Sequence, residues 1–185
     1  MSTNILTDQD IRARLSASPP LLEGLMDPST QIQPCGVDLT VSTVSRFASG
    51  GAVDFDNKHR VLADREALTW KGGAIDLQPG PYHIVYNEIV NLPQDVMALA
   101  YPRSTLLRCG VTVFTAVWDP GYSGRAEALL VVHNPVGFRL YENARVVQLV
   151  FTRLGSQVES AYQGRFNGEN LRPGPHPYDA RRRNA

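Results

Sequence analysis

The feature that most constrains the fold of this chain is a series of short apolar segments separated by turn residues. These segments are residues 37–42, 82–86, 97–101, 110–117, 126–133 and 145–151. Most are rich in Val, Ile, Tyr or Phe, and Gly, Pro, Asn or Asp residues bound them, which is typical of β-strands. The 15 Gly and 13 Pro residues supply the turns that such strands need. The spacing predicts an all-β protein with a closed or sandwich-like sheet.

A short helix is expected at the N-terminus, before the strands begin. Thr7 is a suitable N-cap, and Asp10 completes a partial capping box. Ile11 and Leu15 are spaced so that they share one face of the helix. The Ser18-Pro19-Pro20 sequence should end this helix, because proline cannot continue a helix and restricts the residue before it.

Length and charge limit the classes of function. The chain has 185 residues, the usual size of one domain, and such a chain can bury a core without disulfides or metals. Its 18 Lys and Arg residues balance its 18 Asp and Glu residues, so the formal net charge is zero. A general nucleic-acid or membrane binder would be basic, so we expect neither partner. A few placed arginines can still hold a small polyanionic ligand.

The end of the chain differs in composition from the rest. From Gly164 onward there is little apolar content, and the sequence runs into three consecutive arginines at 181–183. We therefore divide the chain into a β domain at residues 1–163 and a flexible C-terminal arm at residues 164–185. Residues 164–173 are either a mobile polar terminus or an arm that orders over a ligand. The three arginines are a weak basic run and do not make a nucleic-acid site.

Cysteine usage and the N-terminus indicate the compartment. Cys35 and Cys109 lie far apart, and no CxxC pair or Cys/His cluster accompanies them. They are expected to be reduced, buried thiols of a cytoplasmic protein. The polar N-terminus has no apolar segment of the signal-peptide type, and no apolar run is long enough to span a bilayer.

The densest polar segment, residues 101–110, lies between two predicted strands. Its polar side chains are two guanidinium groups and two hydroxyls, and a short helical turn that Leu106 and Leu107 anchor to the core would present them. Exposed amides at a helix start, a hydroxyl and guanidinium groups together form a phosphate cradle. The alternative is a connector with solvated arginines. The candidate residues are Arg103, Ser104, Thr105 and Arg108.

Three further polar residues occupy informative positions. Asp119 ends an apolar run and begins a strong Asp-Pro-Gly turn, so we expect a partly buried carboxylate that acts as a base or orients water, unless it only caps its own turn. Gln148 lies inside a β-branched run, and if buried it needs a hydrogen-bond partner, either backbone or a bound phosphate and water. Asp38 is expected to be structural and to pair with an arginine of the cradle.

Motifs of several other enzymes are absent. The sequence has no GxxxxGK[ST] P-loop, no GxSxG elbow, no HExxH and no zinc deaminase signature. If the protein acts on a nucleotide, it does so by another route.

Taken together and in this order, these segments resemble the motifs of the dUTPase and dCTP deaminase superfamily. The first motif corresponds to residues 36–39, the second to 102–107 with the pattern PRSTLL, the third to 116–124 with D-x-x-Y-x-G, and the fourth to 145–149 with R-x-x-Q-L. The N-terminal residues 5–11 and the Gln33-Pro34 step are similar to the deaminase-type N-terminus, which archaeal-type dUTPases share. The resemblance implies a distorted, jelly-roll-like β-barrel with a short N-terminal helix, assembled as a homotrimer with sites between subunits.

One position separates the two activities of this superfamily. Its deaminases carry a glutamate as general base ten residues after the third-motif aspartate, and here Leu129 occupies that position. Leucine transfers no proton, so the resemblance favours a dUTPase. Glu127 lies two residues earlier, and on a strand it shares a side with Leu129. A dCTP deaminase, or a bifunctional deaminase and dUTPase, therefore stays as an alternative, as does a non-catalytic nucleotide-binding regulatory relative.

The resemblance also implies a role for each candidate residue in hydrolysis of dUTP to dUMP and pyrophosphate. Asp119 would orient the attacking water, and Mg²⁺ would be bound mostly by phosphate oxygens and water. The uracil would be read by backbone groups of the hairpin, and the deoxyribose would pack on Tyr122. From the arm, the short Gly-bounded segment at 164–168 would close the site, although its sequence departs from the superfamily's arm. The implied substrate-binding residues are Arg103, Ser104, Thr105, Thr115, Ala116, Val117, Tyr122, Gln148, Arg165 and Phe166.

Overall fold

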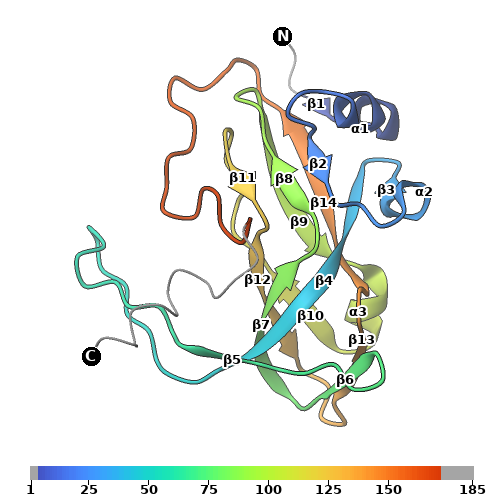
Figure 1. Ribbon diagram of the computed structural model, residues 1–185, viewed down its shortest axis with the longest axis vertical. Helices are drawn as coiled ribbons and strands as arrows, with labels where there is room; N and C mark the ends of the chain where they lie inside the picture. The colour runs from blue at the N-terminus through green and yellow to red at the C-terminus, as the bar shows by residue number, and fades with distance from the viewer. Residues whose placement is uncertain (1–3, 172–185) are drawn as a thin grey trace.

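The computed structural model of the protein describes residues 4–171, which fold into a strongly curved β-structure with short helices at its edges (Figure 1). The main sheet has nine strands. Its central path is β1 (Asn4–Ile5), β14 (Arg145–Arg153), β4 (Gly36–Phe47), β7 (Gly80–Tyr86), β12 (Glu127–Val132) and β10 (Val111–Phe114). Beside this path, β3 (Ile32–Gln33) and β5 (Arg65–Ala67) pair with β4, and β9 (Val96–Pro102) pairs with β14.

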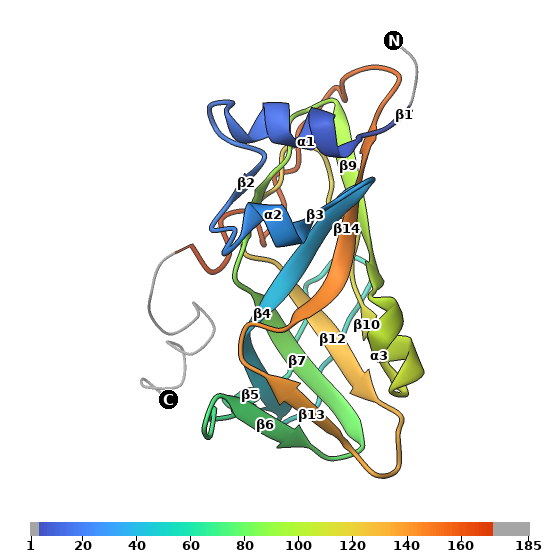
Figure 2. The same ribbon diagram turned by 90° about the vertical axis from the view of Figure 1, so that its right-hand side faces the viewer.

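Smaller elements close the ends of this barrel-like body (Figure 2). One small sheet joins β11 (Ser123–Gly124), β8 (Ile89–Asn91) and β2 (Leu22–Glu23), and another joins β13 (Phe138–Tyr141) and β6 (Ala74–Leu77). The helices are α1 (Asp8–Leu15), α2 (Pro28–Gln31) and α3 (Ser104–Arg108). The prediction of an all-β fold with a distorted barrel is confirmed. No helix within residues 4–171 is long and apolar enough to cross a membrane.

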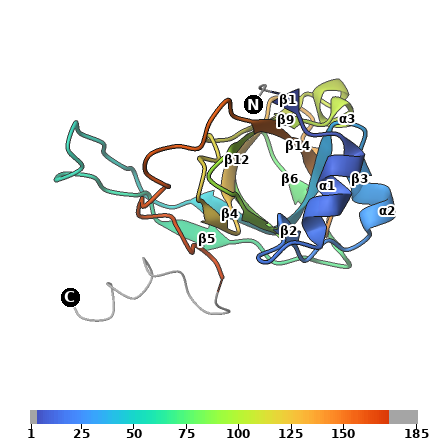
Figure 3. The ribbon, with the colours of Figure 1, turned by 90° about the horizontal axis from the view of Figure 1, so that it is seen from above.

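Strand β4 is the element that holds the two halves of the main sheet together. Its first half pairs with β14, where Asp38 lies opposite Gln148, and its second half pairs with β7, where Ser45 lies opposite His83. The register shifts between Val41 and Thr43, at the change of partner. A bulge of this kind bends a strand and increases its twist, which lets the sheet curl around a core. Seen from above, the strands accordingly curve around a common centre (Figure 3).

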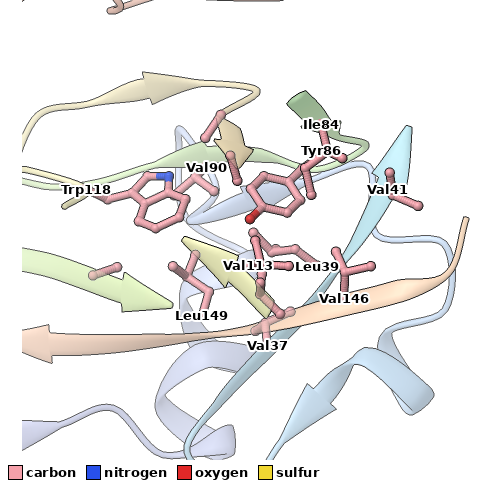
Figure 4. Packing of buried hydrophobic residues seen from close by; sticks show 14 of the residues in the cluster. Val37, Leu39, Val41, Ile84, Tyr86, Val90, Val113, Trp118, Val146 and Leu149 are labelled. Atoms are coloured by element: carbon pink, nitrogen blue, oxygen red, sulfur yellow. The ribbon is translucent and has the colours of Figure 1, made fainter. Parts of the chain in front are cut away.

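Apolar side chains from several strands fill that centre. Figure 4 shows side chains of β4, β7, β10 and β14 directed toward one another around Tyr86 and Trp118, whose ring centroids lie 6.4 Å apart. These residues are almost completely buried, and the alternation of buried and half-buried positions along β12 follows the two-residue period of a strand. Burial of apolar area on this scale is the main favourable term in folding. The core includes Val37, Leu39, Val41, Ile84, Val90, Val113, Val146 and Leu149.

The N-terminal helix forms as the sequence predicts. The Thr7 side chain accepts a hydrogen bond from the Asp10 amide, and the Asp10 carboxylate accepts one from the Thr7 amide, which completes a capping box. Ile11 is fully buried, whereas Leu15 is half-buried at the edge of the core. The helix ends at Leu15, before the Ser18-Pro19-Pro20 sequence.

Several predicted features differ from the structure. The strand expected at residues 110–117 ends at Phe114, because the chain leaves the sheet so that Trp118 can pair with Ala98 and enter the core. The cysteines are free but not buried, since Cys35 is exposed and Cys109 is half-exposed. Only one of the two leucines in α3 anchors that helix, because one short turn presents a single side chain to the core. Leu106 is buried and Leu107 is 58% exposed.

Candidate active site

A pocket of about 380 Å³ opens between the loop before β11, the start of β12 and the C-terminal segment. Its lining contains several residues that are predicted to bind substrate or water and that come from different motifs: Ala116, Val117, Asp119, Tyr122 and Phe166. Both aromatic and carboxylate side chains face the cavity, a mixture typical of small-molecule sites. The remaining lining residues are Trp118, Ala126, Glu127, Tyr162 and Glu169.

The Asp-Pro-Gly turn places Asp119 at this pocket. Trp118 is buried and hydrogen-bonded to Ala98 through both backbone groups, and the Tyr122 amide donates to the Asp119 carbonyl oxygen to close the turn. Gly121 has φ +87°, and a Cβ there would lie 2.6 Å from Cβ of Ala161, so only glycine fits. The Asp119 side chain is exposed in this chain, contrary to the expected partial burial, because Trp118 occupies the buried position at the end of the run.

Tyr122 forms one wall of the pocket. It is 6% exposed, its hydroxyl donates a hydrogen bond to Oε1 of Glu169 over 2.8 Å, and its ring lies 6.0 Å from that of Tyr162. Burial raises the pKa of Tyr122, and the neighbouring Glu169 carboxylate raises it further. Tyr122 therefore stays a neutral phenol, which suits a side chain that packs against a ligand.

Glu127 belongs to an ion-pair cluster. Its Oε2 atom lies 2.7 Å from Nη1 of Arg65 and 2.8 Å from Nε2 of His83, and its Oε1 atom accepts a hydrogen bond from Asn170 over 3.2 Å. Burial raises the pKa of Glu127, but the hydrogen bond from His83 and the charges of His83 and Arg65 outweigh it and leave the pKa at about 2. A carboxylate with so low a pKa is a poor proton acceptor near neutral pH.

The position of the superfamily's general base lies on the same strand. Leu129 and Glu127 are alternate residues of β12, and both are half-buried on the same side of it. Leu129 lies opposite His83 on β7 and opposite Phe114 on β10. On this side of β12, residue 129 is a leucine and the carboxylate of Glu127 is ion-paired. Neither position therefore offers a carboxylate that could act as the base in deamination.

The segment predicted to bind phosphate is attached to a buried carboxylate. Asp38 is 2% exposed, and its Oδ2 atom lies 2.9 Å from Nε of Arg103 and 3.2 Å from Nη1 of Arg145. Asp38 is therefore paired with an arginine of the cradle, as expected. The Arg103 amide donates to the Val146 carbonyl oxygen, so the start of α3 is attached to β14.

The remaining cradle residues are more accessible. Ser104 and Thr105 begin α3 and are exposed, and no side chain caps this helix start. Gln148 is only half-buried, and its Nε2 atom lies 4.0 Å from Sγ of Cys35. The hydroxyls and the amide are thus available to a ligand that approaches this side of the molecule.

The pocket and the cradle do not meet in one chain. Arg103, Ser104, Thr105 and Gln148 are absent from the pocket lining, and α3 lies on the opposite side of the barrel from the C-terminal segment (Figures 1 and 3). Thr115 is half-buried and Arg165 is exposed, and neither lines the pocket. The structure therefore separates most of the predicted residues into two clusters on opposite sides of the chain.

The described part of the arm, residues 164–171, packs against the pocket of its own chain. The Gly168 amide donates to the Ser123 carbonyl oxygen over 2.7 Å, and the Arg125 amide donates to that of Glu169 over 3.0 Å. Phe166 lines the pocket, and the Arg60 guanidinium lies 6.0 Å from its ring centroid. Residues 172–185, including the arginine run, lie outside the described residues, and the domain boundary at residue 163 stays a prediction.

Several residues of this site carry no signal in the sequence. Glu169 and Tyr162 lie in a polar segment without a recognisable pattern, and Arg65 and His83 lie on strands that are far from β12 in sequence. Only Glu127 is indicated by the sequence, because it lies two residues before position 129, where the superfamily's deaminases carry their general base. The other contacts depend on long-range strand pairing, which no local pattern encodes.

Comparisons with known proteins place the chain in a family. A family model described as dCTP deaminase-like matches residues 5–154. A probable deoxyuridine 5'-triphosphate nucleotidohydrolase of Methanosarcina mazei is 48% identical over 167 residues, which cover 90% of this chain and 98% of that protein. The deoxyuridine 5'-triphosphate nucleotidohydrolase of Methanocaldococcus jannaschii is 39% identical over 140 residues, which cover 75% and 88%.

A solved structure supports the same assignment at the level of the fold. The 2'-deoxycytidine 5'-triphosphate deaminase from Agrobacterium tumefaciens superposes with a TM-score of 0.62 at 22% identity, covering 83% of this chain and 49% of that one. The family model spans most of the chain, and the archaeal relatives match over nearly their whole length. The chain therefore belongs to the dCTP deaminase-like family.

Proposed function

We propose that the protein is a dUTP diphosphatase, which hydrolyses dUTP to dUMP and pyrophosphate. The observation that carries this proposal is the pocket that joins Asp119, Tyr122, the 116–117 backbone and Phe166. Two archaeal relatives named probable deoxyuridine 5'-triphosphate nucleotidohydrolase are 48% and 47% identical over 90% of this chain, which supports the same activity. Leu129 at the base position and the ion-paired Glu127 argue against deamination of dCTP.

Asp119 is the residue proposed to act on water. Its exposed carboxylate at the pocket edge accepts a hydrogen bond from a water molecule and orients it for in-line attack on the α-phosphorus. The new bond joins the water oxygen to phosphorus, the bond from phosphorus to the bridging oxygen breaks, and the water proton passes toward Asp119. Pyrophosphate leaves with the electron pair of the broken bond, and dUMP remains.

Residues that line the pocket, or that adjoin its lining in sequence, would orient the nucleoside and close the site. Tyr122 packs on the deoxyribose and leaves no room for a 2'-hydroxyl, and backbone groups of Thr115, Ala116 and Val117 pair with the uracil. Arg165 and Phe166 close the site from the C-terminal segment. Positioning of this kind lowers the barrier because phosphoryl transfer depends mainly on orientation and charge stabilisation.

We propose that Mg²⁺ accompanies the triphosphate. Within residues 4–171, no three His, Cys, Asp or Glu side chains gather into a metal-binding cluster. A magnesium ion held mainly by phosphate oxygens and water needs no cluster of protein ligands. When bound, the ion would neutralise charge on the leaving pyrophosphate.

A homotrimer is proposed because each chain carries the cradle and the pocket on opposite sides. In a cyclic assembly, the cradle of one copy would face the pocket of the next, and Arg103, Ser104, Thr105 and Gln148 would then hold the phosphates. The two free cysteines suit the reducing cytoplasm, where we expect the enzyme to act.

The activity is tested by supplying dUTP and dCTP with Mg²⁺ and measuring pyrophosphate and ammonia separately. Pyrophosphate from dUTP without ammonia from dCTP is expected. Ammonia from dCTP would instead identify a deaminase or a bifunctional enzyme. Binding of dUTP without turnover of any common deoxynucleotide would identify a non-catalytic relative.

A further inference from the structure

Glu169 connects the C-terminal segment to the pocket wall. Its Oε1 atom accepts the hydrogen bond of the Tyr122 hydroxyl over 2.8 Å, and both residues line the pocket. Tyr122 is 6% exposed, while Glu169 is half-buried. The contact therefore joins a residue of the barrel to a residue of the segment that covers it.

Backbone contacts bring Glu169 to this position. The Glu169 carbonyl oxygen accepts from the Arg125 amide over 3.0 Å, and the Gly168 amide donates to the Ser123 carbonyl oxygen over 2.7 Å. Next to them, the Asn170 side chain donates to the Arg125 carbonyl oxygen over 2.9 Å. The segment thus contacts residues 123–125 through a series of turns, with the Glu169 side chain turned toward Tyr122.

The close approach depends on a glycine between the two partners. A Cβ atom at Gly124 would lie 2.8 Å from the Tyr122 hydroxyl and 3.2 Å from Cγ of Glu169. A side chain there would separate the phenol from the carboxyl group. The absence of a side chain at residue 124 therefore permits this hydrogen bond.

From this geometry we propose that Glu169 is a positioning residue, which holds Tyr122 and closes the C-terminal segment over the pocket by hydrogen bonding rather than by its charge. The kinetic part of this inference rests on the proposed function, since it requires Tyr122 to contact the deoxyribose of dUTP. Glu169 acts through Tyr122 and is not assigned any contact with the reacting phosphate.

The charges around Glu169 support a role that needs no negative charge. Burial raises the pKa of Glu169, repulsion from Glu127 adds to this, and the Tyr122 hydrogen bond and Arg65 lower it, leaving the pKa at about 7. The groups that surround this carboxyl across the pocket and the adjoining strands are Tyr122, Glu127, Arg65, Asp119, Tyr162 and Arg125. Removing the charge should therefore leave the contact intact.

The sign of the pH dependence follows from linkage. The pKa of Glu169 is about 7 with the segment in place, against an ordinary value of 4.5, so burial of this carboxyl under the segment is coupled to proton uptake. The full stabilisation is present below about pH 4.5 and is lost as the pH rises through 7. A protonated carboxyl or an amide still accepts the Tyr122 hydrogen bond through its carbonyl oxygen.

The kinetic test compares the wild type with Glu169→Gln and Glu169→Ala between pH 6 and 9, measuring kcat and KM for dUTP. Loss of one hydrogen bond in Glu169→Ala should raise KM about tenfold with little change in kcat. Glu169→Gln should restore a low KM. Above pH 7, the KM of the wild type should rise relative to the KM of Glu169→Gln. Glu159→Gln and Glu159→Ala, at an exposed glutamate ten residues before Glu169, are the matched controls.

Two outcomes would overturn the proposal. One is an unchanged KM in Glu169→Ala, and the other is a Gln variant that is as impaired as the Ala variant, since that result would assign the effect to charge. If Glu169→Ala does not fold, Tyr122→Phe removes only the hydroxyl and must raise KM to a similar extent. The KM of the double variant Tyr122→Phe with Glu169→Gln must then be no higher than that of Tyr122→Phe alone.

A nucleotide-free measurement separates this proposal from the proposed function. Amide hydrogen exchange at Arg125 and Gly168 should become faster in Glu169→Ala, and remain slow in Glu169→Gln and in both Glu159 variants. If the wild type fails to hydrolyse dUTP, the proposed function is wrong, while the exchange rates still decide whether Glu169 holds the segment closed. Equal exchange rates in all variants would show that it does not.

Discussion

The Nε atom of Arg103 lies 2.9 Å from Oδ2 of Asp38, and this ion pair fixes the start of α3 against β4. Arg145 reaches the same oxygen from β14 at 3.2 Å. One buried carboxylate, with a side chain only 3% exposed, thus orients Arg103 of the phosphate cradle and the guanidinium group of Arg145 on β14. The proposed grip on the triphosphate depends on a residue that does not itself touch it.

We expect Asp38→Ala to weaken both stability and substrate binding. Removing one partner of a buried ion pair leaves the two arginines uncompensated, and the cost should be about 3 kcal/mol in the free energy of unfolding, with a higher KM for dUTP. Urea unfolding and steady-state kinetics measure the two effects. Asp76→Ala is the control, because its pair with Arg139 is exposed and should contribute almost nothing. Equal losses in both variants would contradict this prediction.

A site shared between chains predicts complementation between two inactive variants. Asp119→Asn should reduce kcat by about 100-fold or more, because it removes the water-orienting carboxylate, while dUTP still binds. Arg103→Ala should be inactive through loss of phosphate binding. Co-expression of the two variants should restore roughly a quarter of the wild-type activity, since random assembly leaves some pocket–cradle pairs intact. Activity no higher than that of either variant alone would place the whole site within one chain.

The local parts of this structure were predictable because short-range chemistry determines them. The Thr7 and Asp10 capping box, the Asp119 turn and the alternating β12 each depend on neighbouring residues. Strands such as β6 and β13 were missed because they are short and because only pairing with each other stabilises them. The curvature that makes a barrel arises from the change of partner within β4, which no local pattern reveals.

The sequence predicts individual residues of the candidate site, but it does not predict which of them lie together in the structure. Asp119 and Tyr122 were found because their turn and motif are continuous in sequence. The partners of Glu127 were not found, because strand pairing brings His83 and Arg65 to it over long sequence separations. Glu88 shows the same limit: it is fully buried and accepts hydrogen bonds from Gln31 and Thr40, which lie 57 and 48 residues earlier in the chain.

Gly36 should be intolerant of any side chain. A Cβ atom at this position would lie 2.5 Å from the Leu149 carbonyl oxygen and 3.1 Å from Cγ of Gln148. Gly36→Ala should therefore push β4 and β14 apart, at a cost of about 1–3 kcal/mol in the free energy of unfolding, and raise KM through Gln148. Gly50→Ala, where nothing lies within 4 Å of the new Cβ, is the matched control in urea unfolding. Similar stabilities for the two variants would refute the proposed clash.

The ion-pair cluster of Glu127 predicts an acid-labile contribution to stability. The pKa of Glu127 is lowered from 4.5 to about 2, so the folded state binds its proton less readily than the unfolded state does. The stabilisation is fully present above about pH 4.5 and is lost as the pH falls toward 2, and it amounts to something on the order of 3 kcal/mol. The pKa of Glu169 is raised to about 7, so its contribution to stability is lost as the pH rises from 4.5 to 7. The contributions of Glu127 and Glu169 therefore change in separate pH ranges.

Glu127→Gln should therefore lower the free energy of unfolding at neutral pH and flatten its decline between pH 4.5 and 2. The measurement is urea unfolding at a series of pH values. Glu66→Gln, an exposed position on β5 next to Arg65, is the control and should retain the wild-type slope. A Glu127→Gln variant with an unchanged slope would mean that Arg65 and His83 do not hold the carboxylate ionised. In that case Glu127 would be available as a base. Ammonia release from dCTP would then have to be compared between the wild type and Glu127→Gln.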